Sequence, residues 1–252
     1  RRQRQMCIRD SYSSIMSSLM RERDFIMKPT MLIDFDDTLV DFIDAEIQAF
    51  YTIAKDYLNE ATESDLQTFM RVNQAHWEAF QRGELNKEEV LNQRFRNFFA
   101  RYDIEVDGPK VDHEYRTALS KATVTYMPHV LTTLDILKNH YDLYIVTNGV
   151  RITQLRRLKQ TPFETIFKDI FISEDTGSQK PMPEFFDYVF NHIGNERRQD
   201  AIIVGDSLTS DIQGGINAGI RTCWYNGRDK VNDSGIQPDY TIQSFDQLVH
   251  LI

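Results

Sequence analysis

Residues 31–38 read MLIDFDDT, which places three carboxylates and a hydroxyl directly after a short apolar run. The run from Thr30 to Ile33 is apolar without alternation and stops at turn-forming residues, which predicts a buried parallel strand. Asp34, Asp36 and Asp37 are then expected at the carboxyl end of this strand. In open α/β sheets, ligands bind at that edge.

Two of these acids, Asp34 and Asp36, raise an electrostatic problem. At about 4 Å and an effective dielectric near 20, two carboxylates repel by roughly 4 kcal/mol, so a cation is needed to hold them together. Carboxylate oxygens are ligands that suit Mg²⁺. The alternative is a strand that ends in an acidic turn, with Asp37 or Thr38 capping the next helix.

Three further motifs follow, each after a predicted strand or in a loop. They are TNG at residues 147–149, Lys180-Pro181, and GDSLTSD at residues 205–211. In this order, the four motifs resemble the haloacid dehalogenase superfamily of phosphohydrolases, and the resemblance runs from about Lys28 to the end of the chain. It implies a Rossmann-like parallel sheet with an inserted helical cap.

Helical and strand-like patterns occupy different parts of the chain. Between Phe42 and Tyr126, apolar residues recur at spacings of three and four, which predicts four helices without an intervening strand. Strands and helices alternate after Pro128, as in βαβ units. The sequence therefore predicts an α/β catalytic core from residues 30–41 and 127–252, with strands at 143–146, 169–172, 201–204 and 221–225. Residues 42–126 are expected to form the helical cap.

Length and charge limit the class of partner. A chain of 252 residues with 41% hydrophobic residues can bury one large core, or a core plus a smaller lobe. The formal net charge is −9, and the predicted folded part has no basic block, which argues against a nucleic-acid polymer or an anionic membrane. We expect a small anionic molecule held by a local site, on a monomer or a homodimer.

Cysteine usage and hydropathy predict a cytoplasmic protein. Cys7 and Cys223 lack the spacing of a metal-binding pair, and both are expected to be reduced thiols. No stretch approaches the roughly 18 to 20 apolar residues of a membrane span. Residues 1–29 are expected to be a non-native or disordered extension, because RRQRQMCIRDS resembles a translated sequencing adapter and charge interrupts every apolar run.

The superfamily resemblance assigns chemistry to the first motif. It implies that Asp34 attacks phosphorus and forms an aspartyl-phosphate. It also implies that Asp36 protonates the leaving alcohol and then deprotonates the attacking water. Carbon-halide dehalogenases lack an Asp at this second position, which favours phosphoryl chemistry here. Thr38 is expected to hold the loop by hydrogen bonds.

Two motifs are expected to bind the phosphate group. The hydroxyl of Thr147 and the amides of Asn148 and Gly149 precede a predicted helix, whose N-terminus can face an anion. A simple helix cap explains these residues equally well. Lys180 matches the superfamily lysine that contacts the phosphate and the nucleophile, whereas a solvated loop lysine is the plainer alternative.

The last motif is expected to complete the metal site. Asp206 directly follows a predicted strand, and we expect it to bind Mg²⁺ together with Asp34 and Asp36. Asp211 matches the final acid of the motif and is expected to support the site through water or by orienting its neighbours.

The predicted cap carries a more specific resemblance. Residues 72–83, VNQAHWEAFQRG, are similar to a stretch of the YjjG-type pyrimidine 5′-nucleotidases, as are residues 180–188 and 205–224. This implies hydrolysis of nucleoside 5′-monophosphates such as UMP, dUMP and dTMP. Trp77 is a candidate for stacking on the base, and Asn73 and His76 for contacting its edges. An aromatic residue on an inward helix face is, however, often part of the core.

Three other functions remain open from the sequence. One is a different capped phosphatase, acting on phosphoglycolate or a sugar phosphate. The second is an isomerase of the phosphoglucomutase type, which shares the catalytic residues. The third, a non-enzymatic binding protein, is disfavoured by the intact Asp34, Asp36, Lys180 and Asp206.

Overall fold

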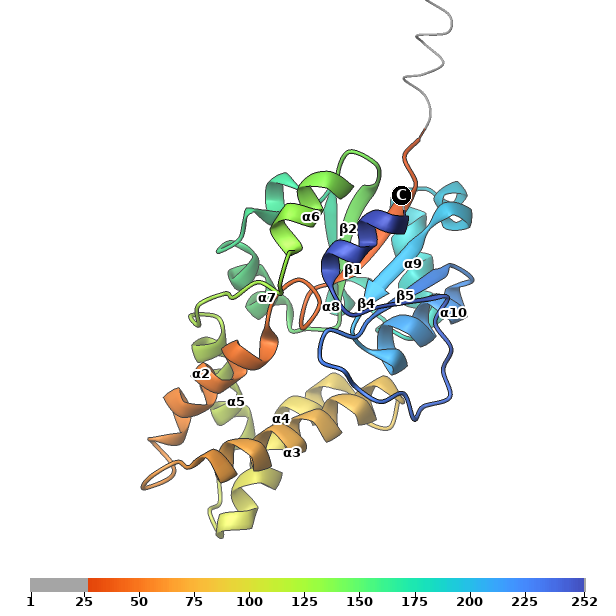
Figure 1. The fold of residues 1–252 in the computed structure, drawn as a ribbon. Helices are drawn as coiled ribbons and strands as arrows, with labels where there is room; N and C mark the ends of the chain where they lie inside the picture. Colours follow the sequence, from red (N-terminus) through yellow and green to blue (C-terminus); the bar gives the residue numbers. More distant parts are fainter. Residues whose placement is uncertain (1–26, 252) are drawn as a thin grey trace, which may run out of the picture.

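The computed structural model describes residues 27–251, so most of the expected N-terminal extension, with Cys7, lies outside the described residues. A parallel six-stranded sheet forms its centre, in the order β3-β2-β1-β4-β5-β6 (Figure 1). The strands are β1 (Thr30–Asp34), β2 (Asp142–Thr147), β3 (Asp169–Ile172), β4 (Ile202–Gly205), β5 (Arg221–Tyr225) and β6 (Tyr240–Ile242). The predicted α/β class and the five predicted strands are confirmed, whereas the edge strand β6 was not predicted.

Helices cover both faces of this sheet, so the central strand β1 is buried throughout. On one face, Met31 and Ile33 pack with α6 (Val130–Leu137), α7 (Arg151–Leu158) and the 3₁₀ segment Phe245–Leu251. On the other face, Leu32 packs with α9 (Pro183–Ile193) and α10 (Gln213–Ala218). Burial on both faces explains the unbroken apolar run of the first strand. The short helix α8 (Ser173–Thr176) follows β3.

Four helices between positions 42 and 119 agree with the predicted helical segment. They are α2 (Phe42–Ala54), α3 (Glu63–Gln81), α4 (Lys87–Phe99) and α5 (Gly108–Leu119), and they lie together below the sheet in Figure 1. Thr62 and Asn86 each form a capping box that starts a helix. We call α2–α5 the helical lobe. Among residues 27–251, no helix has both the length and the apolar composition needed to cross a bilayer.

The helical lobe has an apolar cluster of its own, centred on aromatic rings. Phe69 of α3 stacks on Phe50 and Phe95 with ring centroids 5.3 Å and 5.2 Å away, and meets Phe98 and Tyr115 edge-on. The apolar residues packed in this cluster all lie between positions 42 and 122. This supports the predicted division into a core and a cap, which remains a prediction.

The two chain connections between the sheet and the helical lobe run side by side. The amide of Asp41 donates to the carbonyl of Thr125 at 2.8 Å, and the amide of Met127 donates to the carbonyl of Leu39 at 3.1 Å. Asp37 turns the first connection with a left-handed φ of 56°. Pairing between the connections anchors the lobe over the carboxyl end of β1.

Substituting Phe69→Ala should destabilise the protein by about 3 to 5 kcal/mol, because a large buried ring is replaced by a cavity among four other rings. Urea unfolding followed by tryptophan fluorescence measures the change. The control is Ile152→Ala on the exposed side of α7, where the expected change lies within about 0.5 kcal/mol. Equal losses in the free energy of unfolding for Phe69→Ala and Ile152→Ala would contradict this account of the aromatic cluster.

Candidate active site

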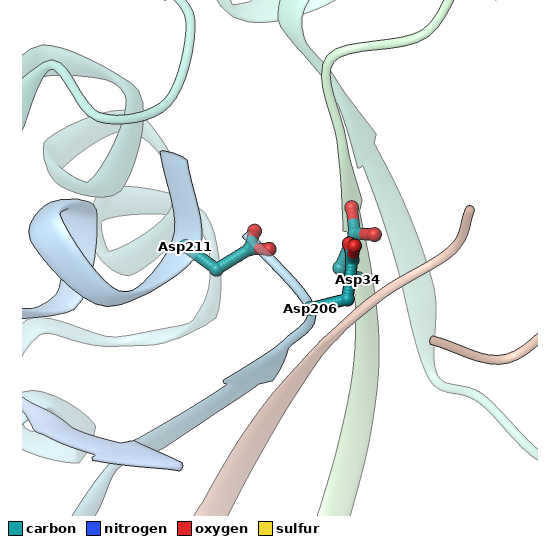
Figure 2. Close-up of side chains that lie close together, drawn as sticks. All are labelled: Asp34, Asp206 and Asp211. Carbon is teal, nitrogen blue, oxygen red and sulfur yellow. The ribbon is translucent and has the colours of Figure 1, made fainter. Parts of the chain in front are cut away.

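Three carboxylates converge at the carboxyl edge of the sheet. Asp34 ends β1, Asp206 directly follows β4, and Asp211 lies in the π-helical turn Leu208–Ile212. One oxygen from each lies within 4.8 Å of those of the other two. Figure 2 shows the three side chains close together, with the carboxylate of Asp211 directed toward the other two. The convergence follows from topology, because β1 and β4 are adjacent and parallel.

A buried lysine neutralises part of this acidic cluster. The Nζ of Lys180 donates to Asp34 Oδ1 and Asp211 Oδ1, each at 2.6 Å, and to the carbonyl of Val146 at 2.9 Å. Burial alone would lower the pKa of Lys180. The pKa is nevertheless raised, because the carboxylates of Asp211 and Asp34 favour the charged form of the lysine. With 1% exposure, Lys180 is therefore not the solvated loop lysine of the alternative interpretation.

The cluster still carries more negative than positive charge. Burial raises the pKa of Asp34 well above its usual range, Lys180 opposes the shift, and the neighbouring acids add to it. Burial likewise raises the pKa of Asp206 to about 6, although Lys230 pairs with it at 2.7 Å. Clustered acids with raised pKa values form a set of hard oxygen donors, which fits Mg²⁺.

The carboxylate of Asp36 faces a different pair of residues. It accepts a hydrogen bond from Gln154 at 2.8 Å and pairs with the guanidinium of Arg157, both on α7. Arg157 is fully buried, with its guanidinium over the ring of Phe35. The expected metal set therefore differs from the observed cluster, in which Asp211 joins Asp34 and Asp206 while Asp36 is held by α7.

The fourth motif requires glycine at position 205, because the side chain of Asp211 lies close to its backbone. A Cβ on Gly205 would lie 2.2 Å from Cγ of Asp211, so any larger residue would displace that carboxylate. Asp211 also accepts from the amide of Ser207 at 3.1 Å. The amide of Asp206 donates to the hydroxyl of Thr38 at 3.0 Å, which ties the first motif to the last.

The TNG segment is hydrogen-bonded within the protein. The hydroxyl of Thr147 accepts from the amide of Gly149 at 3.0 Å and from Gln154 at 2.9 Å. The side chain of Asn148 accepts from the amide of Lys180 at 2.9 Å and donates to its carbonyl at 2.8 Å. In this arrangement Gly149 does not direct its amide to a phosphate as expected, and the Asn148 side chain positions Lys180.

A cavity of about 720 Å³ extends from the acids to the helical lobe. Trp77 and Asn73, two of the candidates for contacting the substrate, line it, and their contact with a base stays a prediction. His76 does not line this cavity, because its ring contacts the carbonyl of Val72 at 2.7 Å and Asn97 at 2.9 Å, and it lines a different cavity. Successive residues turn by about 100° along a helix, so His76 is turned about 60° from Asn73 and about 100° from Trp77, away from the side that faces this cavity.

Sequence patterns missed several polar residues that build the site. Gln154 and Arg157, three residues apart on the helix after the TNG motif, hold Asp36. Lys87, the first residue of α4, donates to the carbonyl of Asn148 at 2.9 Å and so links the helical lobe to that motif. The available signal was an amide and a charged side chain, Gln154 and Arg157, on the buried face of a short helix that also carries Leu158.

Further residues that line the cavity come from the helical lobe. Glu46 of α2, Arg94 of α4 and Tyr115 of α5 are buried there beside Asn73. Both Glu46 and Arg94 occupy inward helix positions at which periodicity alone predicts apolar residues. The cavity therefore has an acidic end at the sheet and a mixed polar and aromatic end in the lobe.

Comparisons with known proteins agree with this architecture. The model of the haloacid dehalogenase-like hydrolase family matches residues 31–225. The HAD-hydrolase YfnB of Bacillus subtilis is 40% identical, covering 88% of this chain and 94% of that protein. The crystal structure of YfnB bound to magnesium superposes with a TM-score of 0.82 at 39% identity, covering 89% of this chain and 98% of that one.

Two further relatives have named activities. The pyrimidine 5′-nucleotidase PynA of Streptococcus pneumoniae is 33% identical, covering 87% of this chain and 92% of that protein. The pyrimidine 5′-nucleotidase YjjG of Escherichia coli is 31% identical, covering 87% of this chain and 95% of that protein. With the family match over residues 31–225 and these relatives along most of its length, the chain belongs to the haloacid dehalogenase-like hydrolases.

Proposed function

We propose that this enzyme is a Mg²⁺-dependent phosphatase that hydrolyses nucleoside 5′-monophosphates, with pyrimidine nucleotides preferred. The observation that carries the proposal is the cavity that joins Asp34 and Lys180 at the sheet edge to the polar wall of the helical lobe. Kinship with PynA and YjjG supports the substrate class. The cytoplasmic location and the choice between monomer and homodimer stay predictions.

The reaction is proposed to pass through a covalent intermediate on Asp34. One carboxylate oxygen of Asp34 attacks phosphorus, and the bond from phosphorus to the leaving oxygen breaks as Asp36 gives that oxygen a proton. Asp36 then takes a proton from water, whose oxygen attacks phosphorus and releases inorganic phosphate from Asp34. Asp36 also lines the cavity, which supports this role.

The phosphate group is proposed to bind against Lys180 and the TNG segment. Lys180 contacts Asp34 directly and offsets negative charge as the phosphate approaches. The Thr147 hydroxyl already accepts from Gly149 and Gln154, so its own proton is the group available to the phosphate. Asn148 acts by fixing the backbone of Lys180.

Asp34 and Asp206 are proposed to hold the metal, with Asp211 beside them. When bound, Mg²⁺ supplies positive charge that stabilises the phosphoryl oxygens. The crystal structure of the relative YfnB bound to magnesium supports the choice of ion. The predicted role of the Asp36 carboxylate as a metal ligand is not supported by its pairing with Arg157.

Asp34→Asn should lower turnover by more than about 10³-fold, because an amide is a poor nucleophile at phosphorus. Phosphate release from UMP measures turnover, and circular dichroism checks the fold. Asp135→Asn, on an exposed side chain of α6, is the matched control and should retain activity. Activity of Asp34→Asn near that of the control would exclude the covalent route.

Removal of divalent ions by a chelator should abolish activity, and Mg²⁺ should restore it. Independently of activity, Mg²⁺ at 100 times its Kd should stabilise the wild type by about 2.7 kcal/mol, because it binds the folded state. Thermal unfolding with and without Mg²⁺ measures this shift. The shift should shrink in Asp206→Asn, and an undiminished shift there would argue against the proposed metal site.

UMP, dUMP and dTMP should be hydrolysed with kcat/KM more than about tenfold above AMP and GMP. Phosphate binding is common to all five, and each misplaced polar contact to the base costs about 1 to 3 kcal/mol. Phosphoglycolate and a hexose phosphate, assayed without added sugar bisphosphate, complete the panel. A preference for either of these, or isomerisation without phosphate release, would refute the nucleotidase proposal.

A further inference from the structure

Four buried polar side chains, one from each helix of the lobe, meet at the cavity wall away from the sheet. They are Glu46 of α2, Asn73 of α3, Arg94 of α4 and Tyr115 of α5, and none is more than 4% exposed. Charged and amide groups are seldom buried in the middle of an aromatic cluster unless they are paired. Their common position at a cavity that also contains Asp34 suggests contact with the distal part of a substrate.

Three of these side chains are locked by hydrogen bonds. Asn73 donates to Oε1 of Glu46 at 2.6 Å and accepts from Arg94 at 2.8 Å. The remaining guanidinium nitrogens of Arg94 pair with Asp112, which also accepts from Arg116. Because the charge of Arg94 is taken up inside the lobe, it orients the wall and does not serve as a second phosphate site.

Two polar groups of the wall are left for a ligand. The Tyr115 hydroxyl is buried beside Glu46 and makes no hydrogen bond of normal geometry among residues 27–251. Burial, and then the nearby Glu46, raise the pKa of Tyr115, so its hydroxyl stays protonated and can donate. In the hydrogen bonds of the described residues, Glu46 uses only Oε1, which leaves Oε2 as an acceptor. A buried hydroxyl without a good partner is unfavourable, and a bound ligand that accepts its hydrogen bond would remove that cost.

The pattern of donors and acceptors indicates the chemistry of that ligand. Glu46 is an acceptor, and the Tyr115 hydroxyl beside it is a donor. A uracil or thymine ring presents the complementary order, an imide N–H flanked by two carbonyls. Cytosine presents an acceptor at the same ring nitrogen, which Glu46 would repel when ionised.

We propose that Glu46 and Tyr115 form the base subsite, in which Glu46 accepts the imide N–H of uracil or thymine and Tyr115 donates to a neighbouring carbonyl. This inference rests on the proposed nucleotidase function and identifies the residues that select its substrate. Burial raises the pKa of Glu46 to about 7, with Asn73, Arg94 and the Tyr115 hydroxyl opposing the rise. At pH 8 most of the Glu46 carboxyl is therefore an acceptor.

The test measures kcat/KM at pH 8 with Mg²⁺ for UMP, for N3-methyl-UMP, which lacks the imide hydrogen, and for p-nitrophenyl phosphate. The wild type should prefer UMP over its N3-methyl analogue by about tenfold or more. Glu46→Gln puts an amide where the acceptor was. This variant should lower the ratio of kcat/KM for UMP to kcat/KM for p-nitrophenyl phosphate about 10- to 100-fold. It should also reduce the preference for UMP over its N3-methyl analogue to less than about threefold.

Tyr115→Phe keeps the ring that packs on Phe69 and Phe95, and removes only the unpaired hydroxyl, so this variant should fold. It should raise KM for UMP with a smaller change in kcat. Tyr57→Phe is the matched control, because Tyr57 also lies in the lobe but donates to Glu114 at 2.6 Å away from the cavity. The control should leave the substrate ratio unchanged.

The outcomes separate this inference from the function on which it rests. If the wild type prefers UMP over phosphoglycolate but hydrolyses N3-methyl-UMP equally well, the base subsite is wrong and the nucleotidase proposal stands. If Glu46→Gln and Tyr115→Phe each lower kcat/KM equally for UMP and for p-nitrophenyl phosphate, the two residues have a structural role and the base subsite is overturned. No preference of the wild type for any nucleotide would overturn both.

Discussion

The ammonium of Lys180 lies buried between the carboxylates of Asp34 and Asp211, and the sheet edge is built around that charge. Breaking a buried ion pair by removing one partner costs about 3 to 5 kcal/mol, so each group constrains the others. Asn148 clamps the lysine backbone, and Gly205 leaves the space that Asp211 occupies. Four segments distant in the sequence are thereby held in a single arrangement.

One lysine cannot balance the acids gathered here. Asp206 adds a third carboxylate to the cluster and is partly compensated by Lys230, which is half exposed. The excess negative charge makes the site receptive to a hard cation and, before one binds, unfavourable for a phosphate. Binding of the metal and of the anionic substrate are for this reason expected to favour each other, with the metal first.

The helical lobe provides the other end of the cavity, and its polarity contrasts with the sheet edge. Its aromatic cluster supplies rigidity, and the Glu46, Asn73 and Arg94 network supplies fixed hydrogen-bonding groups within it. Lys87 connects the lobe to the carbonyl of Asn148, the residue that positions Lys180. The helical lobe and the lysine at the sheet edge are thus linked through one short chain of contacts.

Sequence patterns by themselves determined five of the six strands, the helical insertion and the order of the motifs. Unbroken apolar runs and capping residues such as Asn86 act locally, and acids at the ends of parallel strands must meet at one edge. Only the tertiary structure decided which side chains share that edge. In the structure Asp36 faces Arg157, Asp211 joins Asp34, and His76 lies outside the cavity. Local sequence patterns could not predict these placements, because they depend on helix rotation and on buried charges far apart in the chain. Glu46 and Tyr115 escaped prediction for the same reason, since periodicity marks an inward face but not what it meets there.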